Sequence, residues 1–256
     1  MIIDSHCHLN RLNFDNGMTI KQVIDDAEKK SVEKIISVAT TLEEVNEIKA
    51  IASKFHRVYY TVGVHPCETD CIQPQNSEII IEHSKDKSCV AIGETGLDYY
   101  FNDGLSIKAQ QDKFEIHIAA AQHLNKPVIV HTRQAKEDTL AILKNSNIES
   151  CGGVLHCFTE DWSMAKKAID MGLYLSFSGI VTFKNAQTVQ KVAKKTPIDR
   201  LLIETDSPYL TPVPYRGKSN YPKHVYDVAK FLAKLRNDPF DDFCRATYNN
   251  TCNLFF

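Results

Sequence analysis

The chain lacks several features that would place it in a special class of protein. Positive charge is not in excess, because 30 Lys and Arg residues stand against 32 Asp and Glu residues in 256, so composition alone does not indicate nucleic-acid binding. No apolar run approaches the roughly 18 to 20 residues that cross a membrane, and the first ten residues have no signal-peptide pattern. We therefore expect a cytoplasmic protein with no membrane partner and no obligatory protein partner.

The eight cysteines also lack a pattern, since the sequence has neither a C-x-x-C pair nor the spacing of a zinc ribbon. In a cytoplasmic protein we expect reduced thiols that pack as small apolar side chains. The cysteines are Cys7, Cys67, Cys71, Cys89, Cys151, Cys157, Cys244 and Cys252.

Short β-branched runs alternate with longer helical patterns, and no linker, repeat or low-complexity segment interrupts them. The expected strands are 2–5, 34–39, 58–64, 89–94, 127–131, 153–156, 173–177 and 200–205. The expected helices are 19–31, 42–54, 75–86, 105–125, 134–146, 161–171, 185–195, 223–236 and 239–253. Eight strand-then-helix units predict an α/β fold, a single (β/α)8 TIM barrel that forms one domain over residues 1–256, with a doubly wound open sheet as the alternative.

Polar side chains follow the predicted strands at the points where the strands end. In a barrel these ends meet at one mouth, where the chemistry of the fold takes place. Four imidazoles and two carboxylates are too many for one tetrahedral site with an open position, and they suit two divalent cations. The side chains expected there are His6, His8, Glu94, His131, His156 and Asp206.

Each of these residues could also have only a structural role. A single histidine at a strand end more often makes a hydrogen bond within the protein than binds a metal. We expect Glu94 to bridge two metals with its two oxygens and Asp206 to act as the general base toward a metal-activated water. His65, after the third strand, could orient a ligand or bind substrate. Asp4 could orient a histidine or serve only as an acceptor, and Glu204 could be hydrogen-bonded within the barrel.

Seven stretches of the sequence resemble the successive signatures of the TatD family, which are metal-dependent hydrolases of the amidohydrolase superfamily described as deoxyribonucleases. The likeness covers nearly the whole chain. The stretches are DSHCHL, GVHP, GETGLDY, VIVHTR, LHCFTE, SFSGIVTFKNA and LLIETDSPYLTPVPYRGKSN.

The resemblance implies a TIM barrel with one or two divalent cations, which could be magnesium, manganese or zinc. By matching motif, the two histidines of DSHCHL would bind one cation together with Asp206, Glu94 would bridge, and His131 with His156 would bind the second. The chain departs from the family in two loops. Positions 65–67 read H-P-C where the family commonly has H-P-H, and positions 220–222 read N-Y-P where it has N-E-P. Both loops are expected to meet substrate, so the departures bear on substrate preference.

The leading functional hypothesis is a phosphodiesterase that trims DNA, as an exonuclease on single-stranded ends. An amide, ester or lactone hydrolase with the same metals remains open, because metal-activated water attacks acyl as well as phosphoryl centres. A metal-binding protein without turnover predicts a missing ligand, and none is missing.

A DNA substrate would need contacts to its phosphates and bases, although exposed cations and aromatic side chains often serve only solubility or packing. His65 is also a candidate for substrate binding. Phosphate contacts are expected from Arg133, Lys184, Arg216 and Lys218, and base stacking from Tyr99, Tyr100, Phe101 or Tyr209.

Overall fold

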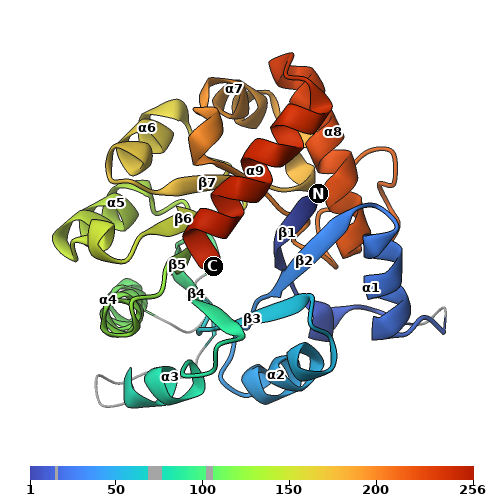
Figure 1. The fold of residues 1–256 in the computed structure, drawn as a ribbon. Helices are drawn as coiled ribbons and strands as arrows, with labels where there is room; N and C mark the ends of the chain where they lie inside the picture. Colours follow the sequence, from blue (N-terminus) through green and yellow to red (C-terminus); the bar gives the residue numbers. More distant parts are fainter. Residues whose placement is uncertain (15–16, 69–76, 102–105) are drawn as a thin grey trace.

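The structure is a computed structural model that describes residues 1–14, 17–68, 77–101 and 106–256. Its eight strands form one sheet in which sequence neighbours are paired in parallel and in chain order (Figure 1). The strands are β1 Ile2–Cys7, β2 Val32–Ser37, β3 Val58–Val62, β4 Cys89–Asp98, β5 Val128–Arg133, β6 Gly153–Leu155, β7 Tyr174–Phe177 and β8 Leu201–Ile203.

The first and last strands lie side by side and close the sheet. The main-chain N–H of Asp206 donates to the His6 carbonyl at 2.9 Å, and the N–H of His8 donates to the Ser207 carbonyl at 2.7 Å. These bonds occur just beyond β8, where the chain leaves the barrel. The predicted (β/α)8 TIM barrel is therefore confirmed, and the doubly wound alternative is wrong.

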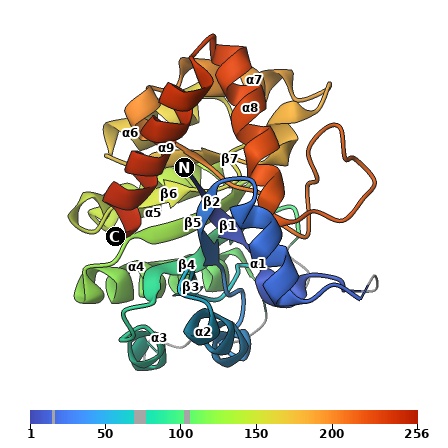
Figure 2. The ribbon, with the colours of Figure 1, turned by 45° about the vertical axis from the view of Figure 1, so that its right-hand side comes forward.

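Helices surround the barrel, and α9 lies across one of its ends (Figures 1 and 2). This is the amino-terminal end of the strands, because the Asn250 side chain in α9 donates to the carbonyls of Ile198 and Leu201 at 2.6 and 2.9 Å. Within the described ranges, no helix is long and apolar enough to cross a membrane. The helices are α1 Ile20–Glu28, α2 Glu44–Lys54, α3 Ser77–His83, α4 Ile107–Leu124, α5 Lys136–Asn145, α6 Trp162–Asp170, α7 Gln187–Lys195, α8 Val225–Arg236 and α9 Phe240–Phe255.

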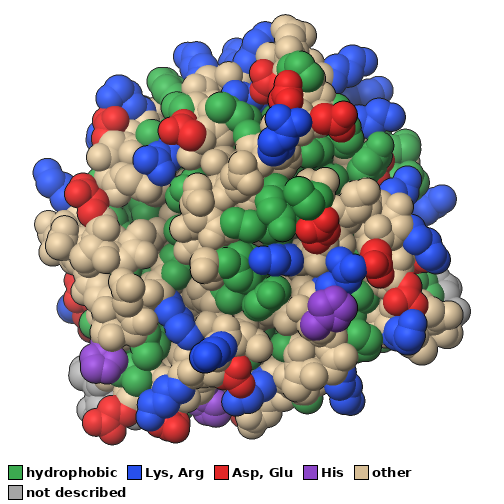
Figure 3. All heavy atoms as spheres, viewed as in Figure 1, with side chains coloured by type: hydrophobic (Ala, Val, Ile, Leu, Met, Phe, Trp, Pro, Cys, Tyr) green, Lys and Arg blue, Asp and Glu red, His purple; other side chains and the backbone are tan. Residues whose placement is uncertain are grey.

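Apolar side chains fill the amino-terminal part of the barrel. One buried cluster combines residues of six strands, among them Ile36 and Ile129, with Phe255 from α9. A larger cluster lies between the sheet and the helices. On the outer face of this end, hydrophobic side chains lie near the middle and charges of both signs are scattered around them (Figure 3). The amino-terminal end is thus closed by packing, and polar chemistry is left to the opposite end.

The strand β4 continues to Asp98, four residues beyond the predicted end at Glu94. Its glycines hid this extension, because glycine is typical of turns. Gly96 pairs with His131 in β5 and has φ +137°, and a Cβ there would collide with the His131 carbonyl oxygen. Glycine thus lets the two strands approach closely at the mouth.

Three predictions touch residues outside the described ranges. The helix expected at 105–125 is present as α4 from Ile107 to Leu124, and position 105 lies outside. The helix expected at 75–86 is present as α3 from Ser77 to His83, and positions 75–76 lie outside. Cys71 also lies outside, and the seven cysteines that the structure describes are all free, as expected.

Candidate metal centre

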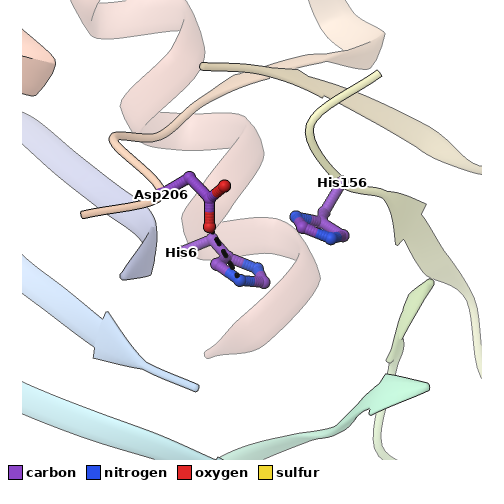
Figure 4. A group of neighbouring side chains, drawn as sticks. All are labelled: His6, His156 and Asp206. Atoms are coloured by element: carbon purple, nitrogen blue, oxygen red, sulfur yellow. Dashed lines mark ion pairs between the residues drawn. The ribbon is translucent and has the colours of Figure 1, made fainter. Parts of the chain in front are cut away.

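The structure brings the six predicted metal ligands together at the carboxyl-terminal mouth of the barrel. Among the residues that the structure describes, three overlapping groups of side chains there could each hold a metal ion, with their ligand atoms within 4.8 Å of one another. Figure 4 shows one of them, in which Asp206 faces His6 and the ring of His156 lies beside it. The six residues are His6, His8, Glu94, His131, His156 and Asp206.

Glu94 lies at the centre, and its two carboxylate oxygens face different histidines. Oε2 is 3.4 Å from His6 Nε2 and 3.9 Å from His8 Nε2. Oε1 is 2.8 Å from His156 Nε2 and 3.0 Å from His131 Nδ1. One buried carboxylate thus connects a set of donors from β1 with a set from β5 and β6.

Asp206 joins the first set. Its Oδ1 lies 3.7 Å from His6 Nε2 and 3.5 Å from His8 Nε2, and its backbone has φ +55°. The rings of His6 and His156 stack with centroids 4.0 Å apart and an interplanar angle of 7°. Because 14% of the Asp206 side chain is exposed, compared with 5% for Glu94, Asp206 is the carboxylate that the cavity reaches more readily.

The donor atoms fit a cation. His8 Nδ1 lies 2.9 Å from the Val38 carbonyl and so donates its hydrogen there, which leaves the Nε2 lone pair facing His6 and Asp206. The Nε2 atoms of His6 and His156 face the two oxygens of Glu94, at 3.4 and 2.8 Å. Carboxylate oxygens and imidazole lone pairs are all electron-rich, and a divalent cation is the partner that satisfies such a set.

Asp98 is a residue of the site that the sequence reasoning missed. Its Oδ2 lies 3.0 Å from His131 Nε2, while Oδ1 accepts the N–H groups of Tyr100 and Phe101 at 2.9 and 2.8 Å. Asp98 is therefore an acceptor, so His131 Nε2 carries the hydrogen and the Nδ1 lone pair faces Glu94.

The signal for Asp98 was present in the sequence. In GETGLD, residues 94, 96 and 98 alternate along a strand and share a face. Because Gly96 is paired with His131, the imidazole lies between the two carboxylates. The prediction that β4 ended at Glu94 concealed this alternation.

The two other buried carboxylates hold the barrel together. Asp4 accepts the N–H and the hydroxyl of Thr205 at 2.8 and 2.6 Å, which matches the interpretation of Asp4 as a strand-end acceptor. Glu204 accepts the N–H of Cys157 at 2.8 Å and the Ser176 hydroxyl. Glu204 Oε1 also lies 3.5 Å from His156 Nδ1. It therefore lies on the side of this imidazole opposite Glu94, which faces Nε2.

The electrostatics keep the central carboxylates ionised. Burial would raise the pKa of Glu94, but His156 and the other imidazoles more than offset it and hold the pKa well below its ordinary value. Burial likewise opposes the ionisation of Asp206, and the neighbouring His8 and His6 outweigh it and lower the pKa. Burial lowers the pKa of His6, and the neighbouring His156 lowers it further. Ionised carboxylates are the state that binds cations. Burial opposes the protonation of His131 and His156, but the carboxylates that face them raise the pKa of both, so a bound cation would displace protons from these imidazoles.

A cavity of about 690 Å³ opens over this cluster. The predicted substrate residues His65 and Arg133 line it. The Arg133 guanidinium carbon lies 4.2 Å from the ring centre of Tyr100 and 4.6 Å from that of Phe101, and both rings are about half exposed. Arg11, which the sequence reasoning did not select, also lines the cavity. Its guanidinium donates to Glu44 at 2.7 Å.

Most of the other predicted substrate contacts do not line the cavity. Arg216 is not among the described residues that line the cavity, and its guanidinium packs 3.9 Å from the ring centre of Phe183. Lys184 and Lys218 are likewise absent from that lining, whereas Tyr209 belongs to it. The Tyr99 hydroxyl donates to Asp138 at 2.7 Å.

The two departures from the family pattern also separate in space. Cys67 lines the cavity, and its thiol contacts the Phe101 carbonyl at 2.9 Å. Tyr221 is buried, and within the described ranges it does not line the cavity. Only the first departure is therefore placed to touch a substrate.

Comparisons with known proteins show the family of the chain. A family model described as TatD related DNase matches residues 3–256. The chain belongs to the TatD family. This TatD protein is 44% identical over 255 residues to the metal-dependent hydrolase YcfH of Escherichia coli K12, with 99% of this chain and 95% of that one covered.

Two further relatives extend the likeness. The metal-dependent hydrolase YabD of Bacillus subtilis is 38% identical over 255 residues, with 100% of this chain and 99% of that one covered. The crystal structure of YJJV, a TatD homolog from Escherichia coli K12, matches with a TM-score of 0.90 and 28% identity, covering 99% of this chain and 97% of that one. The expected family is confirmed, and this TatD protein is a metal-dependent hydrolase.

Proposed function

We propose that this TatD-family hydrolase is a deoxyribonuclease that uses two divalent cations to cleave phosphodiester bonds at single-stranded DNA ends. The observation that carries the proposal is the division of Glu94, whose two oxygens face separate sets of imidazoles. A carboxylate shared in this way suits a pair of cations that act together on one phosphate. The description of the family as TatD related DNase supports the same chemistry.

The predicted ligands form two sets, one for each cation. His6, His8 and Asp206 would hold one cation, and His131 and His156 the other, with Glu94 between them. Bound cations would polarise the phosphoryl oxygens and lower the pKa of water. Asp206 would take the proton of the attacking water as a general base, because its carboxylate faces both the donor set and the cavity.

The surroundings of the cavity support a nucleotide substrate. Arg133 lies against two half-exposed aromatic rings, and such a combination can contact a phosphate and stack on a base. Arg11 supplies a second guanidinium on the lining. The volume, about 690 Å³, lies in the range of small-ligand clefts, roughly 300 to 1,000 Å³. A cavity of this volume can hold a nucleotide from a frayed or single strand.

The test begins with removal of all metal by a chelator, followed by the addition of magnesium, manganese or zinc in separate samples. Imidazole favours zinc and carboxylate favours magnesium or manganese, so all three ions are needed. Single-stranded DNA is assayed beside a panel of esters, amides and lactones. We expect metal-dependent release of nucleotides from single-stranded DNA. Hydrolysis of an ester, amide or lactone with no action on DNA would contradict the proposal and support the acyl alternative.

The role of Asp206 gives a sharper test. We expect Asp206→Asn to keep bound metal and lose turnover by roughly 10² to 10⁴-fold, the usual contribution of a general base. Turnover and metal content are measured on the same sample. Asp199→Asn is the control, because Asp199 is exposed and belongs to the short helix that precedes β8. An Asp206→Asn variant with full activity would remove Asp206 from the role of base.

A further inference from the structure

His65 is held rigidly at the edge of the cavity by the helix α4. The Lys113 ammonium group donates to the carbonyls of His65 and Glu68 at 2.8 and 2.7 Å, so the loop after β3 is fixed on both sides of Pro66. His117, one turn further along α4, accepts the N–H of Val64 at 3.0 Å. The position of the His65 imidazole is therefore determined by the fold.

The same loop determines which nitrogen of His65 carries the hydrogen. The main-chain N–H of Cys67 lies 3.2 Å from His65 Nδ1. An N–H can only donate, so Nδ1 is the acceptor and contributes its lone pair to this bond. In a neutral imidazole the hydrogen is then on Nε2.

This Nε2–H group points at the metal centre. It lies 3.4 Å from His131 Nδ1 and 3.5 Å from Glu94 Oε1, and both atoms are acceptors. His65, Glu94 and His131 form one of the groups close enough to hold a metal ion. However, a nitrogen that carries a hydrogen has no lone pair to give to a cation. His65 thus differs from His8 and His131, whose cluster-facing nitrogens have free lone pairs because their other nitrogens donate to Val38 and Asp98.

We propose that His65 is a hydrogen-bond donor to a phosphate oxygen of the substrate and not a ligand of either cation. This inference rests on the proposed function for the identity of the substrate. A cation at His131 would use the Nδ1 lone pair, and the His65 hydrogen would then be shared between Glu94 and an oxygen bound in the cavity. A fixed N–H donor stabilises negative charge on that oxygen without having to reorient, and such donors contribute strongly to turnover.

The first test observes the hydrogen directly. The zinc-loaded protein is prepared with isotope-labelled histidine, and the ring-nitrogen chemical shifts are measured by NMR before and after the addition of inorganic phosphate. We expect His65 to have an unprotonated Nδ1 and a protonated Nε2, and we expect the Nε2–H signal to shift when phosphate binds. A zinc-bound Nε2, or an Nε2–H signal that phosphate does not move, would overturn the proposal.

The second test compares two substitutions of His65. One keeps only the hydrogen-bond acceptor of the ring, and the other supplies an N–H donor. The His65→Asn side chain can still accept the Cys67 N–H but cannot reach the cavity, whereas the His65→Gln side chain can extend an N–H toward it. We expect His65→Asn to bind both cations with unchanged affinity and to lose kcat by roughly 10²-fold, and His65→Gln to recover part of the rate. His56→Asn is the control, because His56 is exposed in a turn after α2.

The outcomes separate this inference from the proposed function. Loss of one equivalent of metal in His65→Asn would identify His65 as a ligand, and unchanged kcat would show that the donor is not used. Either result overturns the inference. If the wild-type protein does not hydrolyse DNA but phosphate still moves the His65 Nε2–H signal, the proposed substrate is wrong and the donor role stands for another oxyanion. In that case kcat is measured on whichever substrate of the panel is hydrolysed.

Discussion

At the scale of single residues, the hydrogen-bond partner of each imidazole determines whether its other nitrogen is a donor or an acceptor. The Val38 carbonyl and the Asp98 carboxylate each take a hydrogen from a histidine, and the Cys67 N–H occupies a lone pair of another. Of these three histidines, His8 and His131 therefore present a lone pair to the cluster, whereas His65 presents a hydrogen. The donor or acceptor character of a ring depends on atoms of the backbone as much as on its own identity.

Asp98 provides the test at this scale. We expect Asp98→Asn to weaken the binding of the second cation by roughly 10 to 100-fold, the usual effect of removing a carboxylate behind a metal-binding histidine. The reason is that an amide no longer fixes the hydrogen on His131 Nε2 with the strength of a charged acceptor. Metal affinity is measured by competition with a chelating dye.

The control for this prediction is Asp112→Asn, which removes an aspartate that is half-exposed on α4 and paired with Lys108. It should leave both affinities unchanged. Equal affinities in Asp98→Asn and the wild-type protein would mean that His131 needs no such partner.

Sequence reasoning found the residue types at this scale but not their hydrogen bonds. The strand-end histidines could be predicted because parallel strands end at one mouth. The tautomers could not, since they depend on backbone groups such as that of Cys67. The placement of Arg216 against Phe183 also had no sequence signal, because a loop residue can turn to either side.

At the scale of elements, the alternation of strands and helices was enough to predict the barrel, but the ends of strands were not. Eight apolar runs gave the sheet, and each occurs as a strand. The end of β4 was missed because Gly96 is typical of a turn by composition, whereas here its missing Cβ permits close approach to His131. Asp98 was missed for the same reason.

The helix α9 gives the prediction at this scale. Phe255 is 6% exposed and packs into the cluster inside the barrel, whereas its neighbour Phe256 is 50% exposed. We expect Phe255→Ala to reduce the free energy of unfolding by roughly 3 kcal/mol, as other buried aromatic truncations do. Phe256→Ala is the matched control and should cost much less.

Chemical denaturation measures both variants, and each is compared in the same metal state because bound cations add to stability. Equal losses in the two variants would contradict the view that α9 closes the barrel through Phe255. Metal content should be the same in both, since α9 lies at the end opposite the metal centre.

At the scale of the whole molecule, the barrel separates packing from chemistry. Its amino-terminal end is filled by apolar side chains and covered by α9, and its carboxyl-terminal end holds carboxylates and imidazoles around Glu94. The net charge of −2 offers no general attraction for DNA, so under the proposed function bound cations together with Arg11 and Arg133 of the cavity lining would provide it. Overall composition could not predict this local cluster of charged and polar groups. The positions of those groups at the ends of the strands could predict it.

Under the proposed function, two cations bind on either side of Glu94. Anomalous diffraction from crystals grown with manganese tests it most directly. We expect two peaks, one beside His6, His8 and Asp206 and the other beside His131 and His156, with the Glu94 carboxylate contacting both. A single peak, or two peaks of which only one touches Glu94, would contradict the account.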